Sequence, residues 1–152
     1  MTDEQEILAL VVSLAHAQDR RDWSWLASLF APEVHLDFSA VFGNDPVEVS
    51  AEALAQMAQE TLEGFDVTHH TAANVLVDVD GDSAEVRCHV QSYHQLRMDR
   101  GTTDYCLMRG FWEFEVQRIQ ERWRIRRWSI IRTAPWEGDP SLYQVAASRR
   151  SP

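Results

Sequence analysis

Two long stretches in the second half of the chain, residues 84–98 and 103–119, alternate between apolar and polar side chains. Both are rich in β-branched and aromatic residues, which are typical of strands. Because successive side chains of a strand point to opposite faces of a sheet, this period of two predicts long, half-buried β-strands. Residues 65–79 and 123–133 have the same character, and a switch of apolar phase predicts a β-bulge near residues 126–127. The chain is therefore expected to form a long-stranded antiparallel sheet.

The first half of the chain predicts helices instead. Apolar residues recur with a helical period in 4–21, and a short second helix is expected at 23–30, ended by Pro32. A strand is predicted at 33–39 and a third helix at 50–63. Helices followed by long strands indicate an α+β fold, with three N-terminal helices packed on the concave face of a cone-shaped, curved antiparallel (mixed) sheet. The mouth of such a cone is a natural pocket.

The length and the charge of the chain limit its organisation and its partners. With 152 residues, we expect a single domain over 1–152, with a core at about 4–136 and a flexible C-terminal tail at about 141–152. Its 14 Lys and Arg against 24 Asp and Glu give a net charge of −10, which disfavours nucleic acid and anionic membranes as partners. No apolar run approaches the roughly 20 residues that span a bilayer.

The N-terminus and the cysteines predict a cytoplasmic location. The first ten residues carry acidic side chains where a secretory signal carries Lys or Arg. Cys88 and Cys106 form no CxxC pair, so we expect two buried free thiols in a reducing compartment.

Three polar residues are predicted to face the interior. Asp19 lies at the edge of the apolar stripe of the first helix; alternatively, it is a solvated charge at the helix end. His69 and His70 are consecutive on a strand, so only one of them can enter a given pocket. His94 lies on the apolar face of its strand, either as a functional group or as a satisfied core histidine.

Four short stretches carry a family resemblance. They are QDRRDW at 18–23, LDF at 36–38, THHTAAN at 68–74 and YHQLR at 93–97. Together they resemble SnoaL-like proteins of the nuclear transport factor 2-like superfamily. The chain is most similar to the branch that contains scytalone dehydratase and hexachlorocyclohexane dehydrochlorinase, and the resemblance extends over about residues 4–140.

The resemblance implies a set of catalytic residues. Asp19 matches the family's catalytic aspartate, and His70 matches the histidine that this aspartate orients. His94 corresponds approximately to a second histidine of the dehydratase, and an alternative register places Arg100 there. Gln18 and Phe38 stand where the dehydratase has tyrosines, which argues against scytalone itself as the substrate.

The predicted pocket has an apolar, aromatic lining. Six Trp, six Phe and three Tyr suit a pocket for a flat apolar ligand. The residues expected to bind substrate are Gln18, Trp23, Phe38, Asn74, Trp112, Phe114 and Trp128.

The function predicted from these residues is a cofactor-independent lyase. A carboxylate that holds one nitrogen of an imidazole leaves the other free as a general base, so His70 would take a proton from a small hydrophobic hydroxy-carbonyl compound and a dehydration would follow. Alternatives are a polyketide cyclase or isomerase, a two-histidine, one-carboxylate metal site, and a non-catalytic ligand-binding or accessory subunit. We expect no metal and no cofactor.

The outward face of the sheet predicts self-association. Tyr93, His89 and Gln91 lie there among arginines, an unusual mixture for a solvated surface. We therefore expect a homodimer or homotrimer. The chain is also expected to bind a hydrophobic small molecule.

Overall fold

The computed structural model describes residues 1–149, which form five helices and a seven-stranded sheet. The helices are α1 (Asp3–Arg20), α2 (Trp23–Ser28), α3 (Ser39–Phe42), α4 (Ala51–Leu62) and α5 (Leu142–Ser148). The strands are β1 (Phe30–Asp37), β2 (Val47–Ser50), β3 (Val67–Asp80), β4 (Ser83–Arg97), β5 (Thr103–Ile119), β6 (Arg122–Arg132) and β7 (Glu137–Gly138).

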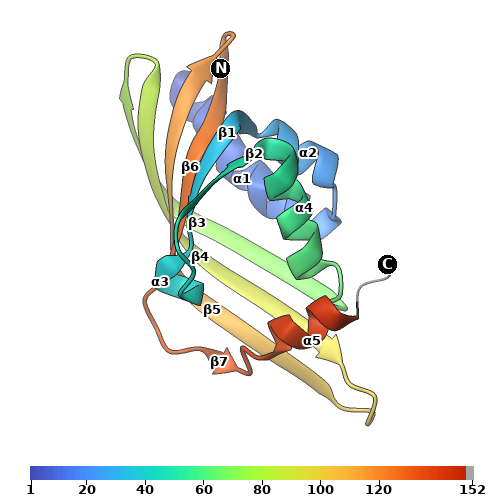
Figure 1. The fold of residues 1–152 in the computed structure, drawn as a ribbon. Coiled ribbons are helices and arrows are strands. Elements are labelled where there is room, and N and C mark those ends of the chain that lie inside the picture. The colour runs from blue at the N-terminus through green and yellow to red at the C-terminus, as the bar shows by residue number, and fades with distance from the viewer. Residues whose placement is uncertain (150–152) are drawn as a thin grey trace.

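The sheet is mixed and strongly curved. Its strand order is β2-β1-β6-β5-β4-β3, and the short β7 pairs with β5. All pairs are antiparallel except β1 with β6, which run parallel. In Figure 1, α1, α2 and α4 lie together against one face of this sheet, and α5 crosses its lower part. The predicted α+β fold, with N-terminal helices on the concave face of a curved sheet, is confirmed.

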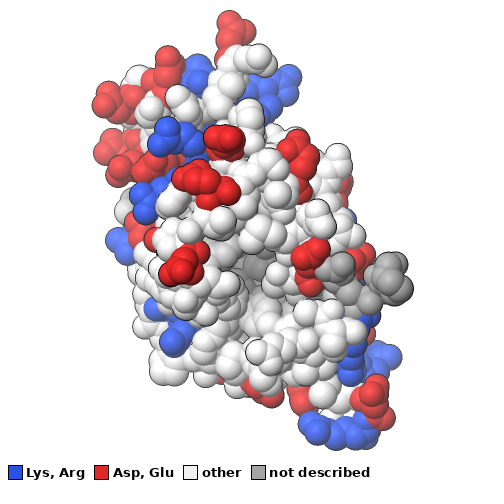
Figure 2. All heavy atoms as spheres, in the orientation of Figure 1, with Lys and Arg blue, Asp and Glu red and all other residues white. Residues whose placement is uncertain are grey.

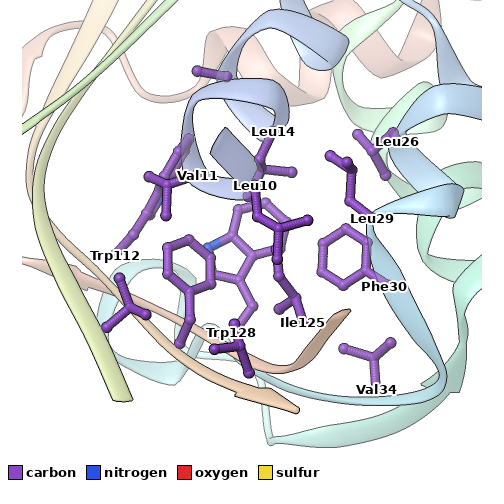
Figure 3. Packing of buried hydrophobic residues seen from close by; sticks show 14 of the residues in the cluster. Leu10, Val11, Leu14, Leu26, Leu29, Phe30, Val34, Trp112, Ile125 and Trp128 are labelled. Atoms are coloured by element: carbon purple, nitrogen blue, oxygen red, sulfur yellow. The ribbon is translucent and has the colours of Figure 1, made fainter. Parts of the chain in front are cut away.

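The main hydrophobic core lies between the helices and the concave face. Apolar residues of α1, such as Leu10 and Leu14, meet Trp112 of β5 and Trp128 of β6 there (Figure 3). The two indole rings pack edge to face with centroids 5.6 Å apart. Large rings that pack in this way bury much apolar area, which stabilises the curved sheet against the helices.

Local sequence patterns predict the sheet correctly at two places. On β4 the even-numbered residues from Ala84 to Leu96 are buried, as the alternation requires. The predicted bulge also exists: Glu115 pairs with Arg127 and Val116 pairs with Ile125, so Arg126 has no partner on β5.

The first strand begins earlier than predicted. Phe30 is already in β1 because it pairs with Ile125 of β6 in the parallel ladder. Pro32 lies within β1, where the pairing with β6 is interrupted between Phe30 and His35. A proline has no N–H to donate to a ladder, so this interruption accommodates it.

Within the segment predicted as a flexible tail, residues 142–148 form the helix α5. Leu142 and Ala146 are buried in a second apolar cluster with residues of α4, β4 and β5. A Cβ atom at Gly64 would lie 1.8 Å from the backbone oxygen of Ala146, so glycine allows α5 to approach the end of α4. The last part of the predicted tail, residues 150–152, lies outside the described residues.

Candidate active site

Asp19 is held at the end of α1 by its neighbour Arg21. Arg21 adopts a left-handed backbone conformation with φ of 56° and caps the helix. Its guanidinium group donates hydrogen bonds to the backbone oxygens of Glu63, at 2.8 Å, and Phe65. Because these carbonyls lie between α4 and β3, the arginine fixes the last turn of α1 against the start of β3.

The Asp19 carboxylate accepts three hydrogen bonds from β3. Its Oδ1 lies 2.7 Å from Nδ1 of His70 and 3.1 Å from the hydroxyl of Thr68. Its Oδ2 accepts from the backbone N–H of His70 at 2.8 Å. The His70 side chain is 4% exposed and that of Asp19 is 23% exposed. Asp19 is therefore not a solvated charge at a helix end; it orients the His70 ring.

The strand register brings His94 beside this pair. His70 is opposite Ser92 and Thr68 is opposite His94 in the β3–β4 ladder, so the two histidines are diagonal neighbours on the concave face. Their ring centroids lie 5.2 Å apart. His69 is on the other face of β3, as the alternation predicts.

Both histidines line a cavity of about 730 Å³ in the concave side of the fold. Figure 2 shows this side of the molecule hollowed, with mainly uncharged side chains around the opening. Its walls come from α1, β1, α3, α4, β3, β4, β5, β6 and α5. Most of the lining is apolar, and its polar side chains include Gln18, Ser92, Glu60 and Tyr143.

Five of the predicted site residues line this cavity together with His70. They are Gln18, Phe38, His94, Trp112 and Trp128, with Asp19 behind His70 as its partner rather than as a lining residue. The remaining three predicted substrate contacts, and the alternative Arg100, lie elsewhere.

The three misplaced residues each have a structural reason. Trp23 begins α2 and borders a separate surface depression beside α4. Phe114 is buried behind Trp128, with ring centroids 6.3 Å apart. Asn74 has φ of 52° at the irregularity of β3, and its side chain lies 3.3 Å from Nδ1 of His89 on the exposed outer face.

Arg100 does not occupy the position of a second polar site group. It lies in the turn between β4 and β5, where its guanidinium group donates to Asp104 at 3.0 Å and to Thr102 at 2.8 Å. Of the two alternatives, His94 is the residue beside His70.

Comparison with known proteins identifies the family of this chain. The SnoaL-like domain family matches residues 1–129. The chain belongs to this family. An uncharacterized protein of Mycobacterium tuberculosis, Rv2910c, is 29% identical to this SnoaL-like protein over 128 residues, which cover 84% of the chain and 83% of the relative.

Solved structures share the fold of the SnoaL-like protein. The Kfla4162 protein from Kribbella flavida has a TM-score of 0.83 at 23% identity, covering 93% of this chain and 95% of that one. A putative scytalone dehydratase from Novosphingobium aromaticivorans gives 0.74 at 20% identity, with 90% and 87% covered. A hexachlorocyclohexane dehydrochlorinase, LinA type 2, gives 0.75 at 15% identity, with 90% and 88% covered. These likenesses show the shared fold, and the predicted membership of the SnoaL-like family is confirmed by the family match.

The electrostatics of the SnoaL-like site favour a charged Asp19 beside a neutral His94. Burial opposes ionisation of Asp19, but the hydrogen bonds and the charge of His70 outweigh it and lower the pKa of the carboxyl group from 3.8. Burial, with the nearby His70, lowers the pKa of His94 from 6.5 to about 3. His94 is therefore a neutral imidazole at physiological pH.

Sequence reasoning missed polar residues of this cavity, among them Ser92, Glu60 and Tyr143. Tyr143 of α5 lines the cavity, and its hydroxyl oxygen lies 3.0 Å from Nδ1 of His94. Burial raises the pKa of Tyr143 well above 10, so its hydroxyl group stays protonated. The apolar pair Leu142 and Ala146, spaced by one helical turn, is the signal that could have placed a helix here.

The described residues show no clustered metal ligands and no membrane-spanning helix. Within residues 1–149, no three His, Cys, Asp or Glu side chains are grouped so as to hold a metal ion. No helix in the same range is long and apolar enough to cross a membrane. The polar chemistry that this arrangement offers is acid–base chemistry by imidazole, carboxylate and phenol groups.

Proposed function

We propose that this SnoaL-like protein is a cofactor-independent lyase that eliminates water from a small hydrophobic hydroxy-carbonyl compound. The observation that carries the proposal is the 2.7 Å hydrogen bond between Asp19 and His70 at the wall of a 730 Å³ cavity. An aspartate that accepts the Nδ1 proton of a histidine fixes the tautomer and leaves Nε2 as a base.

The reaction proceeds in two proton movements. Nε2 of His70 takes a proton from the carbon next to the substrate carbonyl, and the electrons of that C–H bond form the new C=C bond as the C–O bond to the hydroxyl group breaks. The proton gained by His70 then joins the departing hydroxide, which leaves as water. Asp19 stabilises the imidazolium ion formed between these movements, because its carboxylate is charged and 2.7 Å away.

The cavity suits a neutral, flat ligand. Its lining, as far as residues 1–149 form it, contains aromatic side chains of Phe38, Trp112 and Trp128 and no Lys or Arg. A carboxylate or phosphate group would find no cation there, whereas an aromatic or polyketide-like ring would bury its faces against these side chains. The names of two structural neighbours, a putative dehydratase and a dehydrochlorinase, describe eliminations and support the same reaction class.

The cysteines support a reducing, cytoplasmic location for this lyase. Cys88 and Cys106 are buried and unpaired. Burial raises the pKa of these thiols to about 11 and about 12, so they remain protonated and unreactive at neutral pH.

The test is a screen with the purified protein. A panel of neutral aromatic β-hydroxy ketones is incubated with the wild type and with His70→Ala, and products are followed by mass spectrometry. We expect loss of the mass of water with the wild type and little with the variant. A product of unchanged mass that needs His70 would indicate a cyclase or isomerase instead. Turnover that His70→Ala retains would reject the proposed base.

A further inference from the structure

The contact between Tyr143 and His94 joins the last helix to the base of the cavity. Tyr143 packs its ring edge to face against Phe65, at 5.4 Å between centroids, and lies 5.1 Å from the His94 ring. Its hydroxyl oxygen lies 3.0 Å from Nδ1 of His94, which is 1% exposed. The tyrosine is thus held by its neighbours in one position relative to the histidine.

The number of hydrogens on Tyr143 and His94 indicates which of the two donates the hydrogen bond between them. A phenol oxygen has one hydrogen, and the neutral imidazole carries a hydrogen on only one of its nitrogens. Among residues 1–149, Nδ1 of His94 is the acceptor that the Tyr143 hydroxyl reaches, and Nε2 of His94 is buried without a partner. If Tyr143 donates, one polar atom is left unpaired; if His94 donates from Nδ1, both the hydroxyl hydrogen and the Nε2 lone pair are unpaired. Because unpaired buried polar groups are costly, the first arrangement is favoured.

We propose that Tyr143 is a positioning residue that holds His94 in the tautomer protonated at Nε2, and that this N–H donates a hydrogen bond to an oxygen atom of the ligand. The assignment of the tautomer stands on the structure alone, and the role of the donor in turnover rests on the proposed lyase function. Burial, followed by the charge of His70, keeps this imidazole neutral, so it acts as a donor and gives up no proton.

The two histidines then have opposite hydrogen-bonding roles within one cavity. Asp19 holds Nδ1 of His70 and leaves an acceptor, whereas Tyr143 holds Nδ1 of His94 and leaves a donor. Trp112 and Trp128, which also line the cavity, have buried indole N–H groups without an acceptor among the described residues. The unpaired polar atoms are thus N–H groups, which favours a ligand with carbonyl or similar oxygens over a hydrocarbon or a halocarbon.

The tautomer is tested without any substrate by ¹⁵N NMR of the histidine-labelled protein. The His94 signals are assigned by their loss in His94→Gln. We expect the wild type to show a proton on Nε2 of His94 and a bare Nδ1, and Tyr143→Phe to lose this preference. Tyr105→Phe is the matched control, because it removes the same hydroxyl group from a tyrosine that is 45% exposed on β5. A proton on Nδ1 in the wild type, or an unchanged tautomer in Tyr143→Phe, would overturn the proposal.

The donor role is tested with two unreactive probes, 1-tetralone and its parent hydrocarbon tetralin. Dissociation constants for both are measured on the wild type, Tyr143→Phe and Tyr105→Phe, and the ratio of the two constants cancels the general hydrophobicity of the ring system. We expect the ratio to shift about tenfold toward the ketone in the wild type relative to Tyr143→Phe, as one hydrogen bond provides roughly that factor. An equal ratio of the two constants in all three proteins would reject the donor role of His94. Failure of the wild type to bind either probe would reject it as well.

The lyase proposal can fail separately from this one. If the NMR and the probes give the expected results but no member of the ketone panel loses water, Tyr143 and His94 form a ligand site in a protein with another function. If elimination depends on His70 while the His94 tautomer does not respond to Tyr143→Phe, the lyase stands and the role of Tyr143 is rejected.

Discussion

Asp19 accepts hydrogen bonds at both of its oxygens, and this makes its exchange for asparagine a sharp probe. In Asp19→Asn, the amide NH₂ must face either the backbone N–H or Nδ1 of His70, each of which donates to the carboxylate in the wild type. The amide therefore favours the wrong tautomer of His70 as well as removing the charge. We expect kcat/KM for elimination to fall by roughly 10³–10⁴-fold.

The double variant Asp19→Asn/His70→Ala checks that the two residues act as a unit. We expect it to be scarcely less active than His70→Ala alone, since groups that act together are far from additive. Asp45→Asn, in the exposed turn before β2, is the matched control and should retain wild-type activity. Multiplicative losses in the double variant would show that Asp19 acts independently of His70.

The lowered pKa of the buried His94 predicts how the free energy of unfolding depends on pH. Its pKa is about 3 in the folded protein and about 6.5 when exposed, so between these values the unfolded chain binds a proton that the folded one does not. The free energy of unfolding should therefore fall as the pH is lowered from about 6.5, by up to about 1.4 kcal/mol per pH unit. Urea unfolding of the wild type and His94→Gln between about pH 7 and pH 4 measures the difference. Parallel stability curves would contradict it.

At the scale of the elements, local patterns decide what the sequence can predict. The buried face of β4 and the bulge at Arg126 follow from the period of two, which is written in neighbouring residues. Asn74 was misplaced because its left-handed conformation interrupts β3: inward residues are even-numbered before it, as His70 is, and odd-numbered after it, as Val77 is. The seven residues of α5 offer the spacing of Leu142 and Ala146 but are too few for a full helical period, and their position depends on contacts with α4 and β5.

The helix α5 predicts a measurable contribution to stability. Leu142 is 1% exposed in the cluster that α5 shares with α4, β4 and β5, so Leu142→Ala should lower the free energy of unfolding by about 2–5 kcal/mol. Leu76→Ala is the matched control, because this leucine is 71% exposed on β3, and its effect should stay within about 0.5 kcal/mol. Denaturant unfolding measures both. Equal effects would mean that α5 is not a fixed part of the fold.

On the scale of the whole molecule, the sequence predicted the central polar residues of the site better than the residue that α5 contributes to it. Asp19, His70 and His94 were found because a family resemblance and a face alternation pointed to the same concave side. Tyr143 was not, because it meets His94 across 49 positions of the chain and no local pattern encodes such a contact. Residues that complete a site from a distant terminus become visible only once the chain is folded.

The outer face of the sheet carries the last prediction, which is self-association. Tyr93 and Tyr105 stack there with centroids 5.9 Å apart, and the guanidinium group of Arg87 lies 4.1 Å from the centre of the Phe111 ring. Aromatic and arginine side chains of this kind are enriched in protein interfaces.

We therefore expect a dimeric or trimeric mass by light scattering at micromolar concentration, and a shift toward the monomer in Tyr105→Glu, which places a charge within the stacked pair. Leu8→Glu, at a residue of α1 that is 42% exposed against 45% for Tyr105, is the matched control and should keep the mass of the wild type. A monomeric wild type would contradict the predicted self-association through the aromatic outer face. An oligomer that both variants retain would place the interface on another surface.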